Sequence, residues 1–365
     1  MADFDAIIVG GGPAGSTAAH GLARSGAKVI VLEAATFPRQ KLCAGWVTAT
    51  AWQSLGIREE AYPGTLQPFS SATLTVNGRI HASHWDHTVS YGIIRSEFDH
   101  YLVRRAAAAG AIVRDGTTIG TPQKTGTAWT VQTKKETLHA PLLIGAGGHR
   151  CPVARALAEI SPEEAIVLAR ESETHITNET LRGITAHPGT PELFLEEDLN
   201  GYGWSFTKGN FLNIGIGCVS NGRDLNQRCA NMLKRLRAEG RLPADLPRSS
   251  FQGHAYAVRL RRPRRTSGPG WMILGDAAGL ARPFSGEGIG PAIESGRFAA
   301  AAVEQDDLAY YSRALEETFG SGQPSPLAQI ASALPRGILN AIGRRIATNS
   351  TLRRKLIFEN SFGMT

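Results

Sequence analysis

Two glycine-rich motifs near opposite ends of the sequence have the residue types and spacing to bind phosphate groups. The first motif, GGGPAG at residues 10–15, follows the apolar run at residues 6–9. In a G-x-G-x-x-G motif the first glycine permits a tight turn, the second lets the backbone approach a pyrophosphate, and the third lets a helix pack closely on a strand. The start of that helix offers free N–H groups and a positive dipole end to the phosphates. The residues predicted to bind a dinucleotide here are Gly10, Gly12, Pro13, Ala14 and Gly15.

An acidic residue after the second predicted strand supports the same ligand class. The apolar run at residues 28–32 ends in Glu33, about 20 residues beyond the glycines, where a carboxylate accepts a hydrogen bond from a ribose hydroxyl. A glycine-rich turn without a ligand would not explain this acid. We therefore expect Glu33 and its neighbour Ala34 to contact the cofactor.

The second motif, GDAAG at residues 275–279, follows the apolar run at residues 271–274 and precedes PFSGEG at residues 283–288. Two junctions between a strand and a glycine cluster, far apart in one chain, indicate a long cofactor that is held from both ends. FAD is such a molecule.

The elements that must position these motifs alternate between helical and strand patterns. Helices are predicted at residues 13–25, near 47–55 and at 96–110, the last with Ser96 as N-cap and Asp99 three residues on. Residues 71–80 predict a hairpin with an Asn-Gly turn. Residues 165–260 alternate in a way that predicts one antiparallel sheet. The predicted division is a cofactor domain at 1–58, 92–164 and 263–310, a substrate domain at 59–91 and 165–262, and a helical basic C-terminal segment at 311–365.

Composition is that of an ordinary globular enzyme. A chain of 365 residues exceeds what one core usually serves, which favours two domains. The four cysteines lack paired spacing, and His81, His84 and His87 lack accompanying carboxylates, so we predict neither disulfides nor a metal site. The sequence has no apolar run of about 18 residues and enters a strand too early for a signal peptide. We expect a cytoplasmic protein, with peripheral contact at the inner face of the membrane as an alternative.

These motifs, in this order, resemble the FAD-dependent oxidoreductase superfamily that contains para-hydroxybenzoate hydroxylase, the flavin halogenases and the geranylgeranyl reductases. The resemblance covers residues 1 to about 305. It implies an α/β fold in which a Rossmann-like FAD-binding domain of the glutathione-reductase type is interleaved with an antiparallel-sheet substrate domain. It also implies that Asp276 binds the ribityl chain of FAD and that Arg95 lies beside the cofactor. The other residues that it assigns to the flavin end are Gly275, Pro283, Gly286, Gly288 and Ile289.

One motif departs from the superfamily pattern. The hydroxylases usually carry Gly-Ala-Asp-Gly where this chain has GAGG at residues 145–148. That aspartate helps arrange nicotinamide and flavin in the hydroxylases, so its absence counts against NADPH-driven hydroxylation. The electron donor, NAD(P)H or a redox protein, is left open.

Two segments resemble the geranylgeranyl reductase branch. FPRQKLCAG at residues 37–45 is similar to its Lys-x-Cys-Gly-Gly loop, with alanine in place of one glycine. The resemblance implies that Lys41, Cys43 and Ala44 lie at the flavin, where Cys43 is the candidate catalytic residue. An inert thiol lining the pocket is the alternative.

The second segment, YGWSFTK at residues 202–208, is similar to the branch's Tyr-x-Trp-x-Phe-Pro-Lys, with Thr207 in place of proline. Strand alternation puts Tyr202, Trp204 and Phe206 on one face. Such a wall suits a polyprenyl substrate, and the alternative is the inward face of a core strand.

The resemblance therefore favours hydride transfer from reduced FAD to a carbon–carbon double bond of an isoprenoid chain, either a small molecule or a lipid. The alternatives are a flavin monooxygenase acting on an aromatic or polyketide substrate, a halogenase, or a flavin protein that serves only to attach to a membrane or a partner.

Basic residues are concentrated in two places. The first is the run at residues 259–265. The second is the tail, where Arg336, Arg344, Arg345, Arg353, Arg354 and Lys355 alternate with apolar residues. A basic amphipathic helix is typical of a membrane-surface element or of a helix packed on its own protein. No nucleic-acid-binding motif accompanies the charge, so no nucleic-acid partner is expected.

Overall fold

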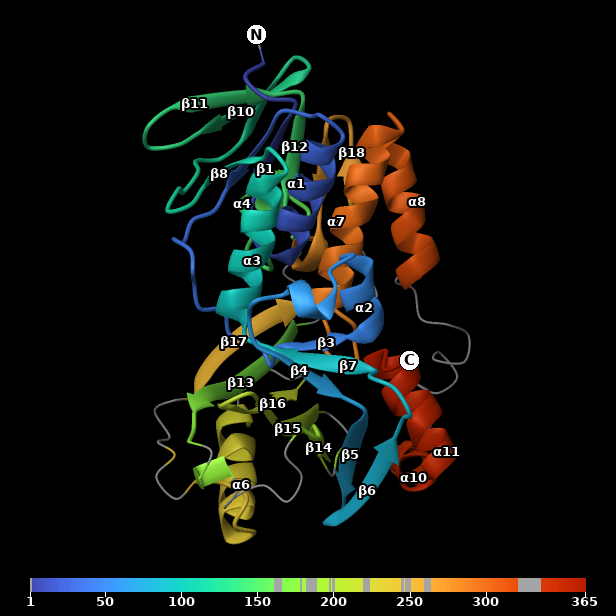
Figure 1. Cartoon of the computed structure of the whole chain (residues 1–365). Coiled ribbons are helices and arrows are strands. Elements are labelled where there is room, and N and C mark those ends of the chain that lie inside the picture. Colours follow the sequence, from blue (N-terminus) through green and yellow to red (C-terminus); the bar gives the residue numbers. More distant parts are fainter. Residues whose placement is uncertain are drawn as a thin grey trace.

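Figure 1 shows the computed structural model of the chain. The structure describes residues 2–160, 166–177, 179–181, 189–196, 198, 201–218, 224–243, 246, 251–258, 264–320 and 336–365. The basic run at residues 259–265 lies mostly outside the described residues. Within the described part of the chain, no helix combines the length and apolarity needed to cross a membrane.

The cofactor half is built on a six-stranded sheet in the order β18-β19-β12-β1-β2-β8. Its strands are β1 (Ala6–Val9), β2 (Val29–Leu32), β8 (Ile112–Arg114), β12 (Leu142–Gly145), β18 (Ser267–Gly268) and β19 (Trp271–Ile273). All pairs are parallel except β18 with β19. Every residue of β1, β2 and β12 is buried, as expected for strands covered on both faces.

Helices α1 (Pro13–Arg24), α3 (Arg95–Ala108) and α7 (Ile289–Glu304) pack beside one another, and α8 (Leu308–Phe319) packs on α7. A three-stranded sheet of β9 (Gln123–Thr125), β10 (Ala128–Gln132) and β11 (Thr137–Ala140) lies near the N-terminus (Figure 1). Helix α1 confirms the helix predicted at residues 13–25.

The predicted cap of α3 is wrong. The helix begins one residue before Ser96, its N-cap is Ile94, and no side chain caps it. Asp99 is fully buried and is used in ion pairs described below. A carboxylate that has a cationic partner inside the protein is better placed there than at a solvent-exposed helix end.

The other half is a seven-stranded sheet in the order β17-β13-β16-β15-β14-β5-β6. Its strands are β5 (Ser71–Val76), β6 (Arg79–His84), β13 (Ile166–His175), β14 (Glu192–Leu195), β15 (Gly201–Lys208), β16 (Phe211–Cys218) and β17 (Gln252–Ala257). The predicted hairpin is β5–β6, with Asn77 at φ 50°. The pairs are antiparallel except β14 with β5, which is parallel.

A helix that the strand-like alternation did not predict, α6 (Leu225–Ala238), interrupts this half of the sequence. Its buried residues recur at helical spacing and pack in a core with residues of β16. A third sheet joins β3 (Trp46–Thr48), β7 (Ser90–Ile93) and β4 (Leu66–Phe69), and β3 leads directly into α2 (Ala49–Ser54). The helix expected near residues 47–55 is therefore a strand followed by a shorter helix.

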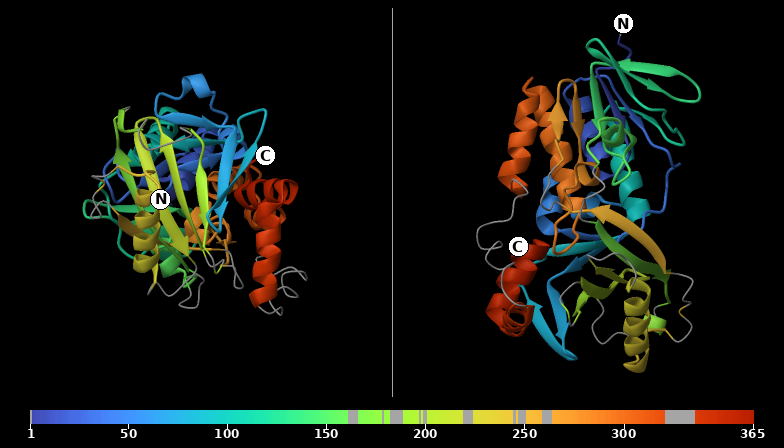
Figure 2. Two further views of the ribbon diagram at one scale, coloured as in Figure 1. Left: turned by 90° about the horizontal axis from the view of Figure 1, so that it is seen from below. Right: turned by 180° about the vertical axis from the view of Figure 1, so that it is seen from behind.

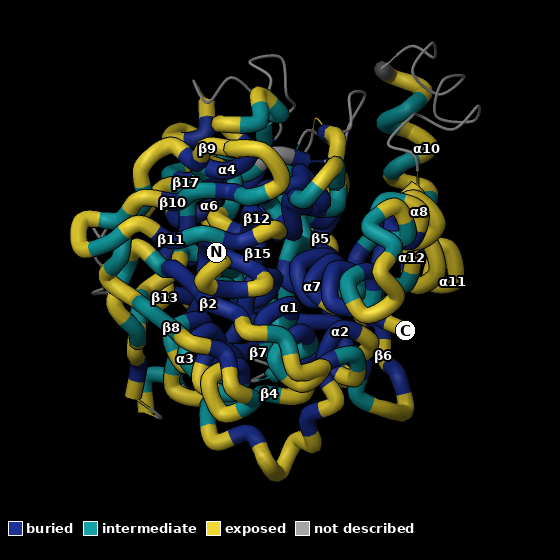
Figure 3. Tube along the Cα trace, turned by 90° about the horizontal axis from the view of Figure 1, so that it is seen from above, coloured by how far each residue is buried: buried dark blue, intermediate teal, exposed yellow. Residues whose placement is uncertain are grey.

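The C-terminal segment folds back beside β5 and β6 (Figures 1 and 2). It comprises α10 (Arg336–Thr348), α11 (Ser350–Leu352), a π-helical stretch at Arg353–Glu359 and α12 (Asn360–Phe362). Its residues Ala347, Ile357, Phe358, Phe362 and Met364 are buried in the core that also holds Trp204 and Phe206. Figure 3 shows the most continuous burial around α1, α7 and β2, whereas much of α10 is exposed.

Candidate cofactor-binding site

A cavity of about 810 Å³ opens where the carboxyl ends of β1, β2 and β12 meet β17 of the seven-stranded sheet. Ligands of open α/β sheets bind at this edge. The cavity is lined by most of the residues predicted from the sequence, namely Gly10, Gly12, Pro13, Ala14, Glu33, Ala34, Lys41, Cys43, Arg95, Asp276, Gly286, Gly288 and Ile289.

Several predicted residues lie outside this lining, namely Gly15, Ala44, Gly275, Pro283, Tyr202, Trp204 and Phe206. Gly15 and Gly275 serve packing, because a Cβ on Gly15 would overlap the carbonyl oxygen of Gly10 and one on Gly275 would lie 3.2 Å from the Cβ atoms of Ala14 and Ala292. The sequence analysis missed other lining residues, among them Arg39, His149, Arg150, His254 and Tyr256. His254 and Tyr256 lie on β17, His149 and Arg150 follow β12, and Arg39 precedes Lys41 in the loop after β2. Their approach to the cavity depends on how the two halves of the fold meet.

The glycine turn fits a pyrophosphate. Gly10 has φ +112°, which favours glycine, and a Cβ there would overlap the backbone of Ala146. The N-terminus of α1 follows with Gly12 as N-cap and without a side-chain cap, so its N–H groups are free to meet an anion. A Cβ on Gly12 would find only the tip of Arg39, at 3.5 Å, so this side of the turn is open to a ligand.

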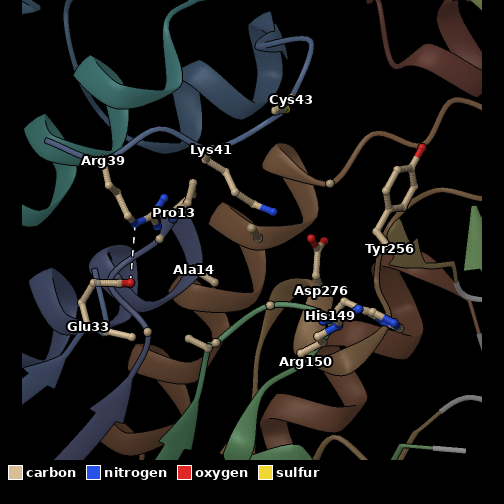
Figure 4. A pocket seen from close by; sticks show the side chains of 18 of the residues that line it. Pro13, Ala14, Glu33, Arg39, Lys41, Cys43, His149, Arg150, Tyr256 and Asp276 are labelled. Carbon is tan, nitrogen blue, oxygen red and sulfur yellow. Dashed lines mark ion pairs between the residues drawn. The ribbon is translucent and has the colours of Figure 1, made fainter. Parts of the chain in front are cut away.

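Glu33 is fixed by the backbone around it. Its two carboxylate oxygens accept hydrogen bonds from the N–H groups of Gly11, at 2.8 Å, and Ala35, at 3.1 Å. Arg39 approaches the same carboxylate at 3.6 Å, as the dashed line in Figure 4 marks, and its Nη1 lies 3.1 Å from Asp99. The carboxylate is therefore held at the end of β2, where the ribose of a dinucleotide lies.

The opposite end of the cavity holds a half-buried carboxylate among cations. Asp276 and Lys41 extend into the same space (Figure 4). Burial raises the pKa of Asp276, and Lys41 and Arg95 partly oppose that rise. A carboxylate that burial disfavours is stabilised by hydroxyl donors, which are what a ribityl chain offers.

Arg95 and Cys43 interact with each other and line the same cavity. Burial alone would lower the pKa of Arg95, but Asp99 and Cys43 raise it above its usual value, so Arg95 stays a cation. Asp99 binds the guanidinium through two hydrogen bonds of 2.8 Å. The Cys43 sulfur is half-buried, lines the cavity and accepts a hydrogen bond of 3.4 Å from the N–H of Gly45.

The start of α7 also meets the cavity, since Gly288 and Ile289 line it. One of its N–H groups, that of Gly290, already donates to Glu287 at 3.1 Å, and Glu287 pairs with Arg282 at 2.8 Å. The positive end of this helix dipole therefore faces the cofactor space with one of its donors already used.

Tyr202, Trp204 and Phe206 lie on one face of β15, as predicted, and form the feature that we call the aromatic wall. Trp204 and Phe206 are buried in an apolar core, as the alternative of an inward strand face predicted, and the half-buried Tyr202 packs against them. The Tyr202 hydroxyl donates to the carbonyl of Ser285 in the loop before α7. Phe362 of the C-terminal segment covers the wall, with its ring 5.4 Å from that of Tyr202.

A Lys–Glu pair, in which only the lysine is buried, ties this sheet to the Cys43 loop. The ammonium of Lys208 is fully buried, donates to the carbonyl of Ala44 at 2.8 Å and pairs with Glu173. Glu171, two residues before Glu173 on the same face of β13, is 1 % exposed, and its Oε2 has no hydrogen-bond partner among the described residues. No role was predicted from the sequence for Lys208, which is the last residue of the YGWSFTK motif, or for Glu171.

Glu171 should make stability depend on pH. Burial raises its pKa from 4.5 to about 7, so between these values the folded protein keeps a proton that the unfolded chain has lost. The free energy of unfolding should therefore fall as pH rises through this window, by up to roughly 3 kcal/mol from this group. In Glu171→Gln this component should be missing, so the variant gains stability relative to the wild type above pH 7.

Urea denaturation at a series of pH values measures this difference. Glu316→Gln, at an exposed helix position, is the matched control and should keep the wild-type slope. Parallel pH profiles for wild type and Glu171→Gln would contradict the assignment.

Comparison with known proteins agrees with the geometry. The FAD binding domain family matches residues 3–300. The chain is 28% identical to the menaquinone reductase of Mycolicibacterium smegmatis, over 87% of this chain and 81% of that protein. It is also 28% identical to digeranylgeranylglycerophospholipid reductase 1 of Methanopyrus kandleri, over 87% of each.

Among solved structures, a geranylgeranyl bacteriochlorophyll reductase-like protein from Thermoplasma acidophilum has the same fold, with a TM-score of 0.78 and 22% identity over 99% of this chain and 97% of that one. The glycine turn, the uncapped start of α1, Glu33 and the half-buried Asp276 all fit FAD. The chain belongs to the FAD binding domain family and is an FAD-dependent oxidoreductase related to the geranylgeranyl reductases.

Proposed function

We propose that the protein reduces carbon–carbon double bonds of an isoprenoid chain of the geranylgeranyl type. The observation that carries the proposal is the aromatic wall, which Tyr202 links to the loop at the flavin end of the cavity. Three large rings on one face suit a hydrocarbon chain that offers no hydrogen-bonding groups. The names of the relatives, a digeranylgeranylglycerophospholipid reductase and a menaquinone reductase, support a substrate of this class.

The wall would position the chain. Phe362 stands against Tyr202, so an isoprenoid on this wall would contact Phe362 or take its place. Holding one double bond over the cofactor removes the entropic cost of the encounter, which is where most of the rate would come from. When bound, reduced FAD supplies the hydride.

The second alkene carbon needs a proton, and we propose that Cys43 holds it at Sγ. The thiol lines the cavity beside Arg95. Cys43→Ala is expected to slow substrate-dependent flavin reoxidation on the order of 100-fold, as general acids commonly contribute. Bound FAD should be unchanged. Stopped-flow absorbance in the absence of oxygen measures this rate, and an unaltered rate in Cys43→Ala would assign the proton to another donor.

The electrons are proposed to come from NAD(P)H or from a redox protein. Gly147 lines the cavity at the position where the related hydroxylases carry aspartate. Without that carboxylate, the arrangement of nicotinamide used by the hydroxylases lacks one of its contacts.

Product analysis tests the proposal. The FAD-loaded protein is reduced chemically and incubated with a geranylgeranyl lipid, once under nitrogen and once in air. A lipid that gains one pair of hydrogens under nitrogen supports the reductase. A lipid that is unchanged under nitrogen, together with an aromatic substrate that gains oxygen in air, would replace this proposal with a monooxygenase.

A further inference from the structure

A second cavity, of about 510 Å³, lies between β6 and the C-terminal segment, away from the cofactor site. We call it the tail pocket. Its lining combines hydroxyl and basic side chains, namely Ser350, Thr351, Arg353, Arg354, Lys355 and His84.

Arg353 is a buried cation without an acidic partner. It is 4 % exposed, and its guanidinium donates to the Ser83 hydroxyl at 3.2 Å and to the carbonyls of Ala347 and Ala82 at 3.0 and 2.7 Å. These acceptors are all neutral, and no described carboxylate pairs with it. Burial accordingly lowers the pKa of Arg353.

The acid in the tail pocket is already engaged. Glu359 pairs with Arg354 at 2.9 Å, which leaves the pocket with a surplus of positive charge. A buried charge is costly unless it has a counter-ion, so an anion entering the pocket would be stabilised.

Exposed apolar side chains lie on the same C-terminal segment as the tail pocket, two of them next to its lining residues in sequence. Leu352 and Leu356, one helical turn apart, are each 38 % exposed, and Ile338 and Ile342 of α10 are 47 % and 46 % exposed. Figure 3 shows α10 standing out from the body of the protein. From residue 336 to the C-terminus the chain carries six basic residues and one acidic residue. Positive charge beside exposed apolar side chains is complementary to an anionic lipid surface.

We propose that the tail pocket binds the phosphate of an anionic lipid headgroup and docks the protein on a membrane surface. Arg353, Arg354 and Lys355 would face the phosphate, with the hydroxyls of Ser350 and Thr351 as further donors. Leu352 and Leu356 would enter the interface between headgroups and acyl chains. This proposal does not depend on the reaction that the cofactor site performs.

Co-sedimentation of the FAD-loaded protein with phosphatidylcholine vesicles, with or without phosphatidylglycerol, tests the proposal. Binding is expected only with phosphatidylglycerol. Arg354→Gln/Lys355→Gln should weaken it on the order of 20-fold, since each basic residue near such a surface contributes about fivefold. Lys134→Gln/Lys135→Gln removes the same charge from the exposed β10–β11 turn and should leave binding unchanged.

Two further arms separate a built pocket from diffuse charge and from soluble phosphate. Ser350→Ala/Thr351→Ala keeps every charge and should still weaken vesicle binding by roughly fivefold or more, because it removes two hydrogen-bond donors. Inorganic phosphate is the competitor. The proposal is overturned by equal binding to both vesicle types, by an equal loss in the lysine control, by full binding of Ser350→Ala/Thr351→Ala, or by uptake of inorganic phosphate without vesicle binding.

Discussion

Replacing Asp276 with alanine is expected to weaken FAD binding by roughly 10- to 100-fold, because a hydrogen bond to a charged acceptor contributes about 1.5–3 kcal/mol. Asp276 is the half-buried carboxylate at the flavin end of the cavity, and its partial removal from water raises its pKa. A carboxylate in that environment lowers the stability of the protein without ligand. Hydrogen bonds donated by a ligand offset this cost. Fluorescence titration of the apoprotein with FAD measures the change.

The same variant separates binding from folding. Since desolvation disfavours the Asp276 carboxylate without ligand, the Asp276→Ala apoprotein should unfold at a temperature no lower than the wild-type apoprotein. Asp86→Ala removes a carboxylate whose side chain is 96% exposed and is the matched control. An Asp276→Ala protein that purifies with a full complement of FAD would contradict the cofactor assignment.

Replacing Lys208 with methionine is expected to lower the free energy of unfolding by about 1–3 kcal/mol, because the Ala44 carbonyl loses its hydrogen-bond donor and Glu173 loses its cation. Lys208 is fully buried between Glu173 and the Ala44 carbonyl. It also lowers the pKa of Glu171, so its loss leaves two carboxylates without their nearby cation. The Cys43 loop loses its tie to β15, and substrate-dependent flavin reoxidation should slow together with stability.

A double-mutant cycle isolates the pair. Lys208→Met/Glu173→Gln should be less destabilised than the sum of the single changes, by about 0.5–3 kcal/mol. Lys135→Met, at an exposed turn, controls for loss of a lysine and should be neutral. Purely additive effects in urea denaturation would mean that the pair has no role in holding the loop.

The parts of the fold that the sequence predicted are those encoded by local patterns. Continuous apolar runs became β1, β2 and β19, and GGGPAG became the turn into α1, because both depend on neighbouring residues alone. Glu33 was predictable for the same reason, since its distance from the glycines is fixed by one strand–helix–strand unit.

The parts that the sequence did not predict depend on partners far along the chain. Asp99 has the spacing of a capping residue, but Arg39 and Arg95 meet it inside the protein, and this pairing decides its role. Glu171 alternates like any strand residue, and it lies between β16 and β17, which pair with β13 on either side.

The conformation of the C-terminal segment also depends on contacts with residues far along the chain. Its basic and apolar residues fit either a membrane-surface helix or a helix packed on the protein, and the sequence left both open. In the structure Phe358 and Phe362 are buried against the core of the seven-stranded sheet, whereas Leu352 and Leu356 are exposed. One segment therefore packs on the protein with one side and presents an apolar surface with the other.

The central claim, that an isoprenoid double bond accepts the electrons, is tested most directly by the visible spectrum of the flavin. The FAD-loaded protein is reduced under strict exclusion of oxygen and mixed with a geranylgeranyl lipid, with the fully saturated lipid as control. If the double bond accepts the electrons, the oxidised flavin spectrum is expected to return with the unsaturated lipid only. A flavin that stays reduced with both lipids and is reoxidised only when air is admitted would contradict it.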